Sequence, residues 1–273
     1  MPAAPIVTVD SITRIAEEAN GAVVVNASHG GVYAAYLAAK IGAAAAIFND
    51  AGVGREGAGI GGLDYLQRLG IPAATVGHMT ARIGDGADML ARGIITHANP
   101  LALALGVRPG MACRDAASAL TRAEPTQAAP PPALEGAFLL VSDRPQVWAL
   151  DSASLVAPEH HDAIVVTGSH GGLLGGRPET ALKYDVRAAF YSDAGIGIDE
   201  AGVSRLPALD RRGIAAATVA ADSARIGDAR SSYEDGVLSR ANARAAALGL
   251  RPGMTAREAV AILRRAFARE ETP

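Results

Sequence analysis

Short apolar runs alternate with helix-like stretches along this chain. In its first part the runs lie at residues 23–26, 43–48 and 71–76, each flanked by Gly, Asn or Asp. They are apolar at consecutive rather than alternate positions, which is typical of parallel strands buried on both faces. Helix-like stretches at 32–40 and 63–69 follow the first two runs. This alternation predicts an α/β fold, a parallel sheet with helices on both faces.

Further elements are expected in the same part of the chain. Ile6–Val9 is a short β-like run, and Asp10-Ser11 has the chemistry of an N-cap for a helix after it. The expected helices cover residues 12–19, a long stretch from about residue 81 towards Thr96, and residues 99–105 and 109–122.

Four motifs of the first part return in the second part, in the same order. The pairs are Ser28-His29-Gly30-Gly31 with Ser169-His170-Gly171-Gly172, Asn49–Gly54 with Ser192–Gly197, Thr80–Asp85 with Ser223–Asp228, and Gly106–Met111 with Gly249–Met254. Internal repeats of this kind predict a tandem duplication of a parallel-sheet βα unit. We expect two pseudo-twofold-related α/β halves, residues 1–122 and 146–273, because duplicated units commonly pack as homodimers do. Residues 123–145, rich in Pro and Ala, are expected to be the linker.

The copies are not identical in length. Their spacing grows by two residues between the Ser28/Ser169 pair and the Asp50/Asp193 pair. The extra residues fall at 173–180, where glycines and a proline interrupt the helical pattern of the first copy. We expect the entrance to this helix to be remodelled, so that the two halves need not be equally competent in binding or catalysis.

Composition narrows the class of protein. The chain has 273 residues, 49% hydrophobic and 19% charged, with a net charge of −3, which indicates neither a nucleic-acid surface nor disorder. Apolar runs fall short of the roughly 20 residues that a membrane span needs. The single cysteine, Cys113, argues against a disulfide framework. With no signal peptide expected, the prediction is a cytoplasmic protein that binds neither nucleic acid nor membrane, with a homo-oligomer as an open alternative.

The repeated motifs follow predicted strands, so we expect them to meet at the carboxyl edge of each sheet, where ligands of α/β proteins bind. His29 and His170 would supply acid–base chemistry, and Ser28 and Ser169 are candidate nucleophiles. Backbone N–H groups of the Gly-Gly pairs could stabilise an oxyanion. The structural alternative is a tight turn in which the serine caps a helix.

Two further pairs are expected at this edge. Asp50 and Asp193 could orient the histidines, act as bases or bind a metal, or could form Asx-turns that nucleate the following loop. Arg82 and Arg225 could hold a substrate carboxylate, or pair with Asp85 and Asp228 three residues later.

Other features leave the chemistry open. His78 has no counterpart in the second copy, and with His29 and Asp50 it could form a metal site, although no tight ligand spacing supports one. The glycine-rich loop at 52–62 contains a GxGxxG pattern, but that pattern follows the second strand of the unit, so a mobile flap over the site is favoured over a nucleotide site.

Two families share a few of these residues. The strand followed by His29-Gly30 is loosely similar to caspase-type peptidases, which have a cysteine where this chain has Asp50 or Asp193. The strand, nucleophile, His and Gly order also resembles the DJ-1/PfpI family, with Ser28 or Ser169 in place of its cysteine. Because the cysteine is missing in both comparisons, neither activity carries over.

The function predicted from the sequence is a small-molecule enzyme, most simply a hydrolase of an amide-like or ester-like bond in a small, anionic carboxylate compound. A metal-dependent lyase or hydrolase and a non-catalytic anion-binding regulatory module are the alternatives. No cofactor is expected, and a divalent metal stays open. The catalytic candidates are Ser28, His29, Asp50, Ser169, His170 and Asp193, and the substrate-binding candidates are Gly30, Gly31, Gly52, Arg82, Gly171, Gly172, Gly195 and Arg225.

Overall fold

The computed structural model describes residues 3–126 and 128–270 and has an α/β fold with two mixed, mostly parallel sheets. The first sheet has the order β1-β2-β3-β4-β5. Its strands are β1 (Ile6–Val9), β2 (Val23–His29), β3 (Ala45–Asn49), β4 (Ala73–Val76) and β5 (Ile95–Ala98). The first four are parallel, and β5 pairs antiparallel with β4.

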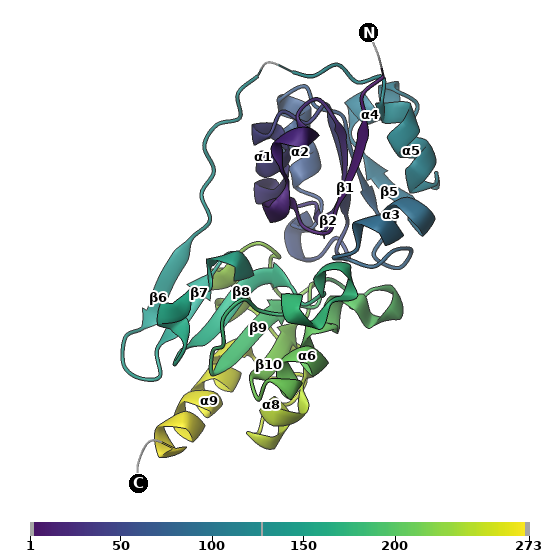
Figure 1. Ribbon diagram of the computed structural model, residues 1–273. Helices are drawn as coiled ribbons and strands as arrows, with labels where there is room; N and C mark the ends of the chain where they lie inside the picture. The colour runs from purple at the N-terminus through teal and green to yellow at the C-terminus, as the bar shows by residue number, and fades with distance from the viewer. Residues whose placement is uncertain (1–2, 127, 271–273) are drawn as a thin grey trace.

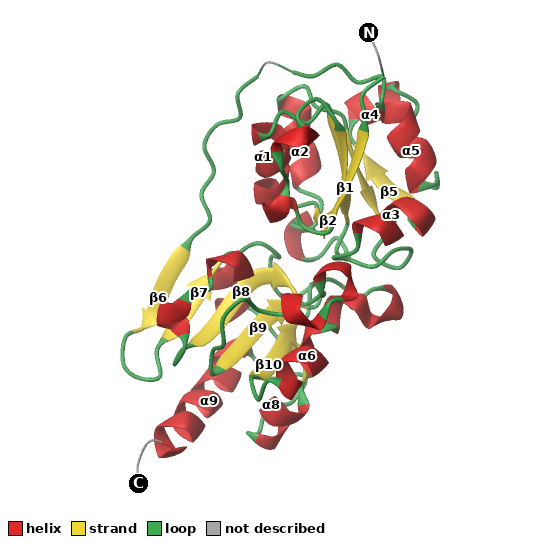
Figure 2. Cartoon of the chain, viewed as in Figure 1, coloured by secondary structure: helices red, strands yellow, loops and turns green. Residues whose placement is uncertain are grey.

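The second sheet has the order β11-β10-β9-β8-β7-β6. Figure 2 labels β6 to β10 of this sheet. Its strands are β6 (Ala137–Val141), β7 (Val147–Leu150), β8 (Ile164–His170), β9 (Ala188–Ser192), β10 (Ala215–Val219) and β11 (Leu238–Ala241). The four central strands are parallel, and the edge strands β6 and β11 are antiparallel to their neighbours.

Helices cover both faces of the first sheet. One face packs against α1 (Val32–Lys40) and α2 (Gly62–Arg68), and the other against α3 (Gly86–Arg92), α4 (Pro100–Ala104) and α5 (Cys113–Leu120). Consecutive residues of a strand serve opposite cores, so that Val23 and Val25 face α3–α5 while Val24 faces α1 and α2. This accounts for strands that are apolar throughout, as the sequence predicted.

The second sheet is covered differently on its two faces. The helices α7 (Ala229–Glu234), α8 (Ala243–Ala247) and α9 (Ala256–Glu270) form one layer, and α6 (Arg205–Arg211) lies on the other face. Where the first half has α1, the second has two single 3-10 turns, η6 (Leu174–Gly176) and η7 (Pro178–Thr180). The remodelling expected at 173–180 is confirmed, and a positive φ at Gly175 and Gly176 explains it.

Two expected helices are wrong. The long helix expected from residue 81 towards Thr96 ends at Arg92, where Gly93 closes α3 and the β-branched residues after it form the edge strand β5. The helix expected at 12–19 is two 3-10 turns, η1 (Ile12–Arg14) and η2 (Glu17–Ala19).

The segment expected to be a linker contains structure. Residues 128–136 run along one side of the molecule, on the left in Figure 1, and the apolar stretch from Ala137 then forms β6. The second sheet therefore begins inside the predicted linker 123–145. Below, "first half" denotes residues 3–122 and "second half" residues 137–270.

The two halves meet end to end at the carboxyl edges of their sheets (Figure 1). A small apolar cluster of Ala51, Ile83, Ala194, Ala201 and Ile226 is buried between them. Backbone hydrogen bonds cross the interface in corresponding positions, from Arg55 N–H to the Ala221 carbonyl (2.8 Å) and from Ile198 N–H to the His78 carbonyl (2.9 Å). The edge that the sequence marked as functional is thus largely an interface within the chain.

Candidate functional site

A cavity of about 540 Å³ remains between the two halves beside this interface. It is lined by the ends of β2 and β8, by residues following β1 and β7, by α1, by the 3-10 turns η6 and η7, and by the connecting segment. The side chains in its wall that could take part in binding or catalysis include Ser28, His29, Glu135, Ser169, His170 and Arg205.

The two histidines are the last residues of β2 and β8, so the strands carry them directly into the cavity. Nδ1 of His29 accepts a hydrogen bond from Gly31 N–H (3.2 Å), and Nδ1 of His170 accepts one from Gly172 N–H (3.1 Å). A neutral imidazole whose Nδ1 is an acceptor carries its proton on Nε2. Each ring also lies against the other half: a methyl group added at Gly227 would be 3.2 Å from Cε1 of His29.

Burial keeps both rings neutral. It lowers the pKa of His29 to about 4, and it lowers the pKa of His170 well below the usual value, with further depression from Arg205 and His29. At neutral pH both rings are therefore hydrogen-bond donors through Nε2–H. The acid–base role expected for them conflicts with this tautomer, because the Nε2 lone pair that a base would use is protonated.

Both serines act as acceptors for backbone groups. Ser28 Oγ accepts from Ile12 N–H (3.0 Å) and Ser169 Oγ accepts from Ala153 N–H (2.8 Å), which holds the turn after β1 or β7 against the neighbouring strand. In the described residues no hydrogen bond joins either hydroxyl to a histidine, so no Ser–His dyad is formed.

The Gly-Gly pairs do not present free donors. Gly30 N–H donates to the Asn49 carbonyl (2.9 Å) and Gly171 N–H to the Ser192 carbonyl (2.8 Å), while the second glycine of each pair donates to its histidine. Sheet extension and the histidine turn thus use the N–H groups at which an oxyanion site was expected, and that site stays a prediction.

Neither Asp50 nor Asp193 lines the cavity, and no hydrogen bond in the described residues joins either carboxylate to His29 or His170. Asp50 Oδ1 accepts from His78 Nδ1 (2.9 Å) and from the N–H groups of His78 and Gly52, and Thr96 Oγ1 donates to Oδ2 (3.0 Å). Hydrogen bonding to His78 lowers the pKa of Asp50 against the opposing effect of burial. Asp193 makes the matching bonds to Gly195 N–H and Ala221 N–H. Both carboxylates build the following loop, which is the structural alternative considered above.

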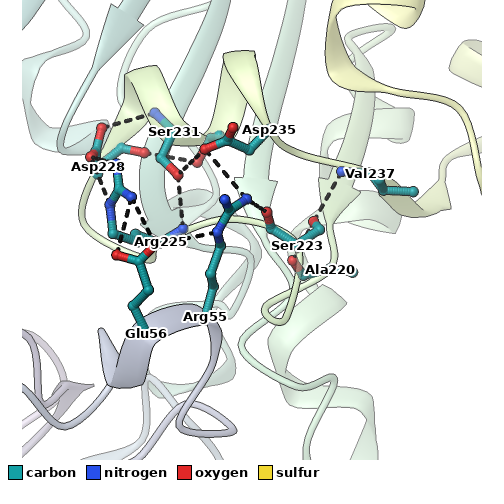
Figure 3. Close-up of polar contacts among 10 residues, drawn as sticks. Arg55, Glu56, Ala220, Ser223, Arg225, Asp228, Ser231, Asp235 and Val237 are labelled. Atoms are coloured by element: carbon teal, nitrogen blue, oxygen red, sulfur yellow. Dashed lines mark hydrogen bonds and ion pairs between the residues drawn. The ribbon is translucent and has the colours of Figure 1, made fainter.

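The repeated arginines are engaged by carboxylates of the chain itself. Figure 3 shows Arg225 between Glu56 of the first half (3.2 Å) and Asp228 of the second (3.0 Å). Arg82 correspondingly contacts Asp85 (2.9 Å) and, across the interface, Asp199 (3.3 Å). Their geometry is that of interface ion pairs rather than of a carboxylate-binding site.

The glycine-rich loop, expected to be a mobile flap, packs against the second half. Gly52 and Gly195 pack against each other, and a methyl group added at Gly52 would be 3.0 Å from the Gly195 Cα atom. A methyl group added at Gly54 would be 2.9 Å from the Ala221 carbonyl oxygen. The glycines let the two loops approach across the interface, which explains them without a nucleotide or a moving lid.

Arg205 is a buried cation in the cavity wall. Its side chain is 5% exposed, Nε donates to the Gly172 carbonyl (2.9 Å), Nη1 donates to the Ala181 carbonyl (2.6 Å), and the guanidinium stacks on the Tyr191 ring at 5.0 Å. No carboxylate within the described residues forms an ion pair with it. Burial lowers its pKa, and a buried positive charge of this kind favours an anionic ligand.

Glu135 is the titratable group of the cavity. It belongs to the connecting segment and is partly buried beside Ser152. Burial, with a further contribution from the Asp151 carboxylate, raises its pKa to about 7 although a hydrogen bond with Ser152 opposes the shift. A carboxyl group with a pKa near 7 in a cavity has the property of a general acid–base catalyst.

Sequence reasoning missed both residues for identifiable reasons. Arg205 has no repeat partner, since Gly62 occupies the equivalent position, so comparison of the two copies passes over it. Glu135 lies in a Pro- and Ala-rich stretch whose composition predicts a linker. Only their burial in a shared cavity reveals them.

In residues 3–126 and 128–270, no three His, Cys, Asp or Glu side chains are grouped closely enough to hold a metal ion. Nor does any helix in these ranges have both the length and the apolar character that crossing a bilayer requires. Comparison of the chain with protein families, curated proteins and solved structures finds no match.

Proposed function

We propose that this protein is a hydrolase that cleaves an amide or ester bond of a small carboxylate compound in the cavity between its halves. One observation carries the proposal: a single cavity collects a buried Arg205 without a carboxylate partner, two neutral histidines, and Glu135 with a pKa of about 7. These are an anion-binding group, hydrogen-bond donors and an acid–base group, the three functions that water-dependent acyl transfer needs.

In the proposed mechanism Arg205 binds the substrate, a histidine stabilises negative charge, and Glu135 acts first as a base and then as an acid. Arg205 would hold the substrate carboxylate, and Nε2–H of His29 or His170 would donate to the carbonyl oxygen as negative charge develops there. Glu135, ionised, would take a proton from water as the water oxygen attacks the carbonyl carbon. The protonated Glu135 would then give that proton to the leaving nitrogen or oxygen as the C–N or C–O bond breaks.

We also propose that the two halves derive from a tandem duplication and pack about a pseudo-twofold axis. The paired interface contacts support this: Arg82–Asp199 corresponds to Arg225–Glu56, and Gly52 faces its own counterpart, Gly195. Such an origin places the cavity where the active site of an ancestral homodimer interface would lie.

A non-catalytic anion-binding module is the second candidate. It is favoured by Arg205, which needs only an anion, and by histidines held in a donor tautomer. A metal-dependent lyase or hydrolase would use the Asp50–His78 pair, which lies outside the cavity wall.

The test is turnover of N-acetylglycine and of its ester analogue, acetoxyacetate. We expect Glu135→Gln to lower kcat by about 10²- to 10⁴-fold with little change in KM, because it removes the proton acceptor and keeps the shape of the side chain. Arg205→Met should raise KM, because it removes the carboxylate partner.

The control is His161→Gln, which changes an exposed histidine whose ring bonds to its neighbour Asp162 and lies outside the cavity wall. His161→Gln should leave the kinetics unchanged, whereas His29→Gln should lower kcat. Wild-type turnover in a folded Glu135→Gln variant would refute the proposed mechanism. Binding of both compounds without turnover would favour the anion-binding module.

A further inference from the structure

A second hollow, an apolar groove of about 410 Å³, continues from the cavity along α1. It shares Ile12, Thr13, Tyr33, Glu135 and Ser154 with the cavity wall, so Glu135 lies at the junction of the two. Arg205 and both histidines line the cavity alone. From Arg205 to the groove, a bound molecule would therefore pass Glu135.

One face of α1 makes the apolar wall of the groove. Tyr33, Leu37 and Ile41 recur at four-residue spacing, which places them along one side of the helix and its C-cap. Ile12 and Ile15 of the turn after β1 form the opposing wall. Leu37 and Ile15 are only partly buried, although each packs against the core beneath α1.

The second half has no such wall. Its 3-10 turns replace α1, and they bring Glu179, Thr180 and Lys183 to the cavity instead. The segment with the two-residue insertion thus places Glu179 and Lys183 at one end of the hollow, beside Leu174 and Leu182. The other end has five apolar side chains, together with Thr13, Glu135, Ser154 and the exposed Lys40, whose ammonium group lies over the Tyr36 ring at 5.8 Å. A ligand that matches both ends has a carboxylate at one terminus and an apolar chain at the other.

We infer that the substrate is an acyl derivative with an apolar chain, such as an N-acyl amino acid, whose carboxylate lies at Arg205 and whose acyl chain lies in the groove of Ile12, Ile15, Tyr33, Leu37 and Ile41. The inference rests on the proposed function and assigns its substrate class. In this orientation the bond to be cleaved lies between the two ends, beside Glu135.

Binding of 2-alkoxyacetates tests the groove separately from catalysis, because these compounds have the carboxylate and the chain but no bond to hydrolyse. Calorimetry on the whole protein would give Kd for methoxy-, propoxy- and hexyloxyacetate. Burial of each added methylene should strengthen binding about fourfold until the groove is filled.

Two variants locate the effect. Leu37→Asn should abolish most of the gain with chain length, and Ile15→Asn, on the opposite wall, should do the same if Leu37→Asn fails to fold. The matched control is Leu105→Asn, because Leu105 is also a partly buried leucine packed on a core of the first half but lies outside the groove. That variant should keep the full gain.

The outcomes separate the two proposals. Methoxyacetate binding that depends on Arg205 but does not strengthen with chain length would overturn the groove and leave the carboxylate site standing. A gain that survives both groove variants would also overturn it. If no alkoxyacetate binds, the carboxylate site fails together with the groove. Absent turnover of N-hexanoylglycine, which has both the carboxylate and the chain, together with chain-dependent binding would refute only the catalytic proposal.

Discussion

Arg205 is the residue whose environment is least expected from its chemistry. A buried guanidinium without a carboxylate partner is costly to the free protein, and an anionic ligand would offset that cost. Arg205→Met should therefore change the free energy of unfolding of the ligand-free protein by less than about 1 kcal/mol, or increase it, while N-acetylglycine binding is lost. Chemical denaturation and calorimetry measure the two effects.

The control for this substitution is Arg212→Met at the other end of the same helix. Arg212 is paired with Asp185 and lies outside the cavity. Its loss should leave binding intact. A large destabilisation in Arg205→Met would instead assign Arg205 to the fold.

Glu135 makes stability depend on pH with a definite sign. In the folded protein its pKa is about 7, against 4.5 for the free side chain, so the unfolded chain loses this proton first. Its contribution to the free energy of unfolding is fully present below pH 4.5 and is lost as pH rises through 7. Relative to the wild type, Glu135→Gln should gain about 1 to 2 kcal/mol between pH 4.5 and pH 8, a figure reduced for its partial exposure. Parallel denaturation profiles of the two proteins would contradict the shift.

Among the elements, the short helices α4 and α8 depend on buried asparagine caps. Asn99 Oδ1 accepts from Ala102 N–H (2.9 Å) and Ala73 N–H (3.0 Å), and Nδ2 donates to the Ile71 carbonyl (2.9 Å). Asn242 makes the same contacts with α8 and β10. Each side chain ties a helix to the neighbouring strand.

We expect Asn99→Ala and Asn242→Ala each to lower the free energy of unfolding by about 3 kcal/mol, because a cap is lost and buried backbone groups lose their partners. Urea denaturation measures the effect. Asn20→Ala, at an exposed asparagine, should stay within about 0.5 kcal/mol of the wild type. If Asn99→Ala and Asn242→Ala changed the free energy of unfolding as little as Asn20→Ala, the caps would contribute little to stability.

Element prediction succeeded where local signals agreed and failed where they competed. The α1 bounds were predicted correctly at 32–40, and Asp85 and Asp228, expected as partners of the repeated arginines, also cap α3 and α7. The edge strand β5 was missed because Gly93 ends a helix without changing the apolar pattern that follows. The strand β6 was missed because its apolar run adjoins a Pro-rich stretch.

On the scale of the whole molecule, the interface between the halves concentrates unusual backbone. In the described residues, every non-glycine residue with positive φ lies in the two loops that meet there, at 51–56 and 194–200. Such conformations are costly and persist only where the surroundings hold them. The close contact between Gly52 and Gly195 is part of the same packing.

Gly52→Ala and Gly213→Ala compare strain with packing. Both glycines have positive φ, +75° and +70°, but only Gly52 has backbone atoms near the added methyl group. Gly213→Ala should cost about 1 kcal/mol of unfolding free energy, and Gly52→Ala about 2 kcal/mol more. Gly52→Ala should also weaken ligand binding, because it separates the halves that form the cavity. Identical stability and affinity of the two variants would show that the interface accommodates the methyl group at residue 52 without a free-energy cost.

Local patterns in the sequence were sufficient to predict the α/β class, most strands, the corresponding motifs of the two halves and the conversion of one helix into turns. These follow from periodicity, glycine content and capping chemistry, which act between residues close in the chain. Which groups at the sheet edges stay free to bind a ligand depends on tertiary packing. It paired Arg82 and Arg225 with carboxylates from the opposite half, used the Gly-Gly amides in turns, and placed Glu135 and Arg205 in one cavity. Burial and long-range contacts set the charge state and the partner of a side chain, and neither can be read from its neighbours in sequence.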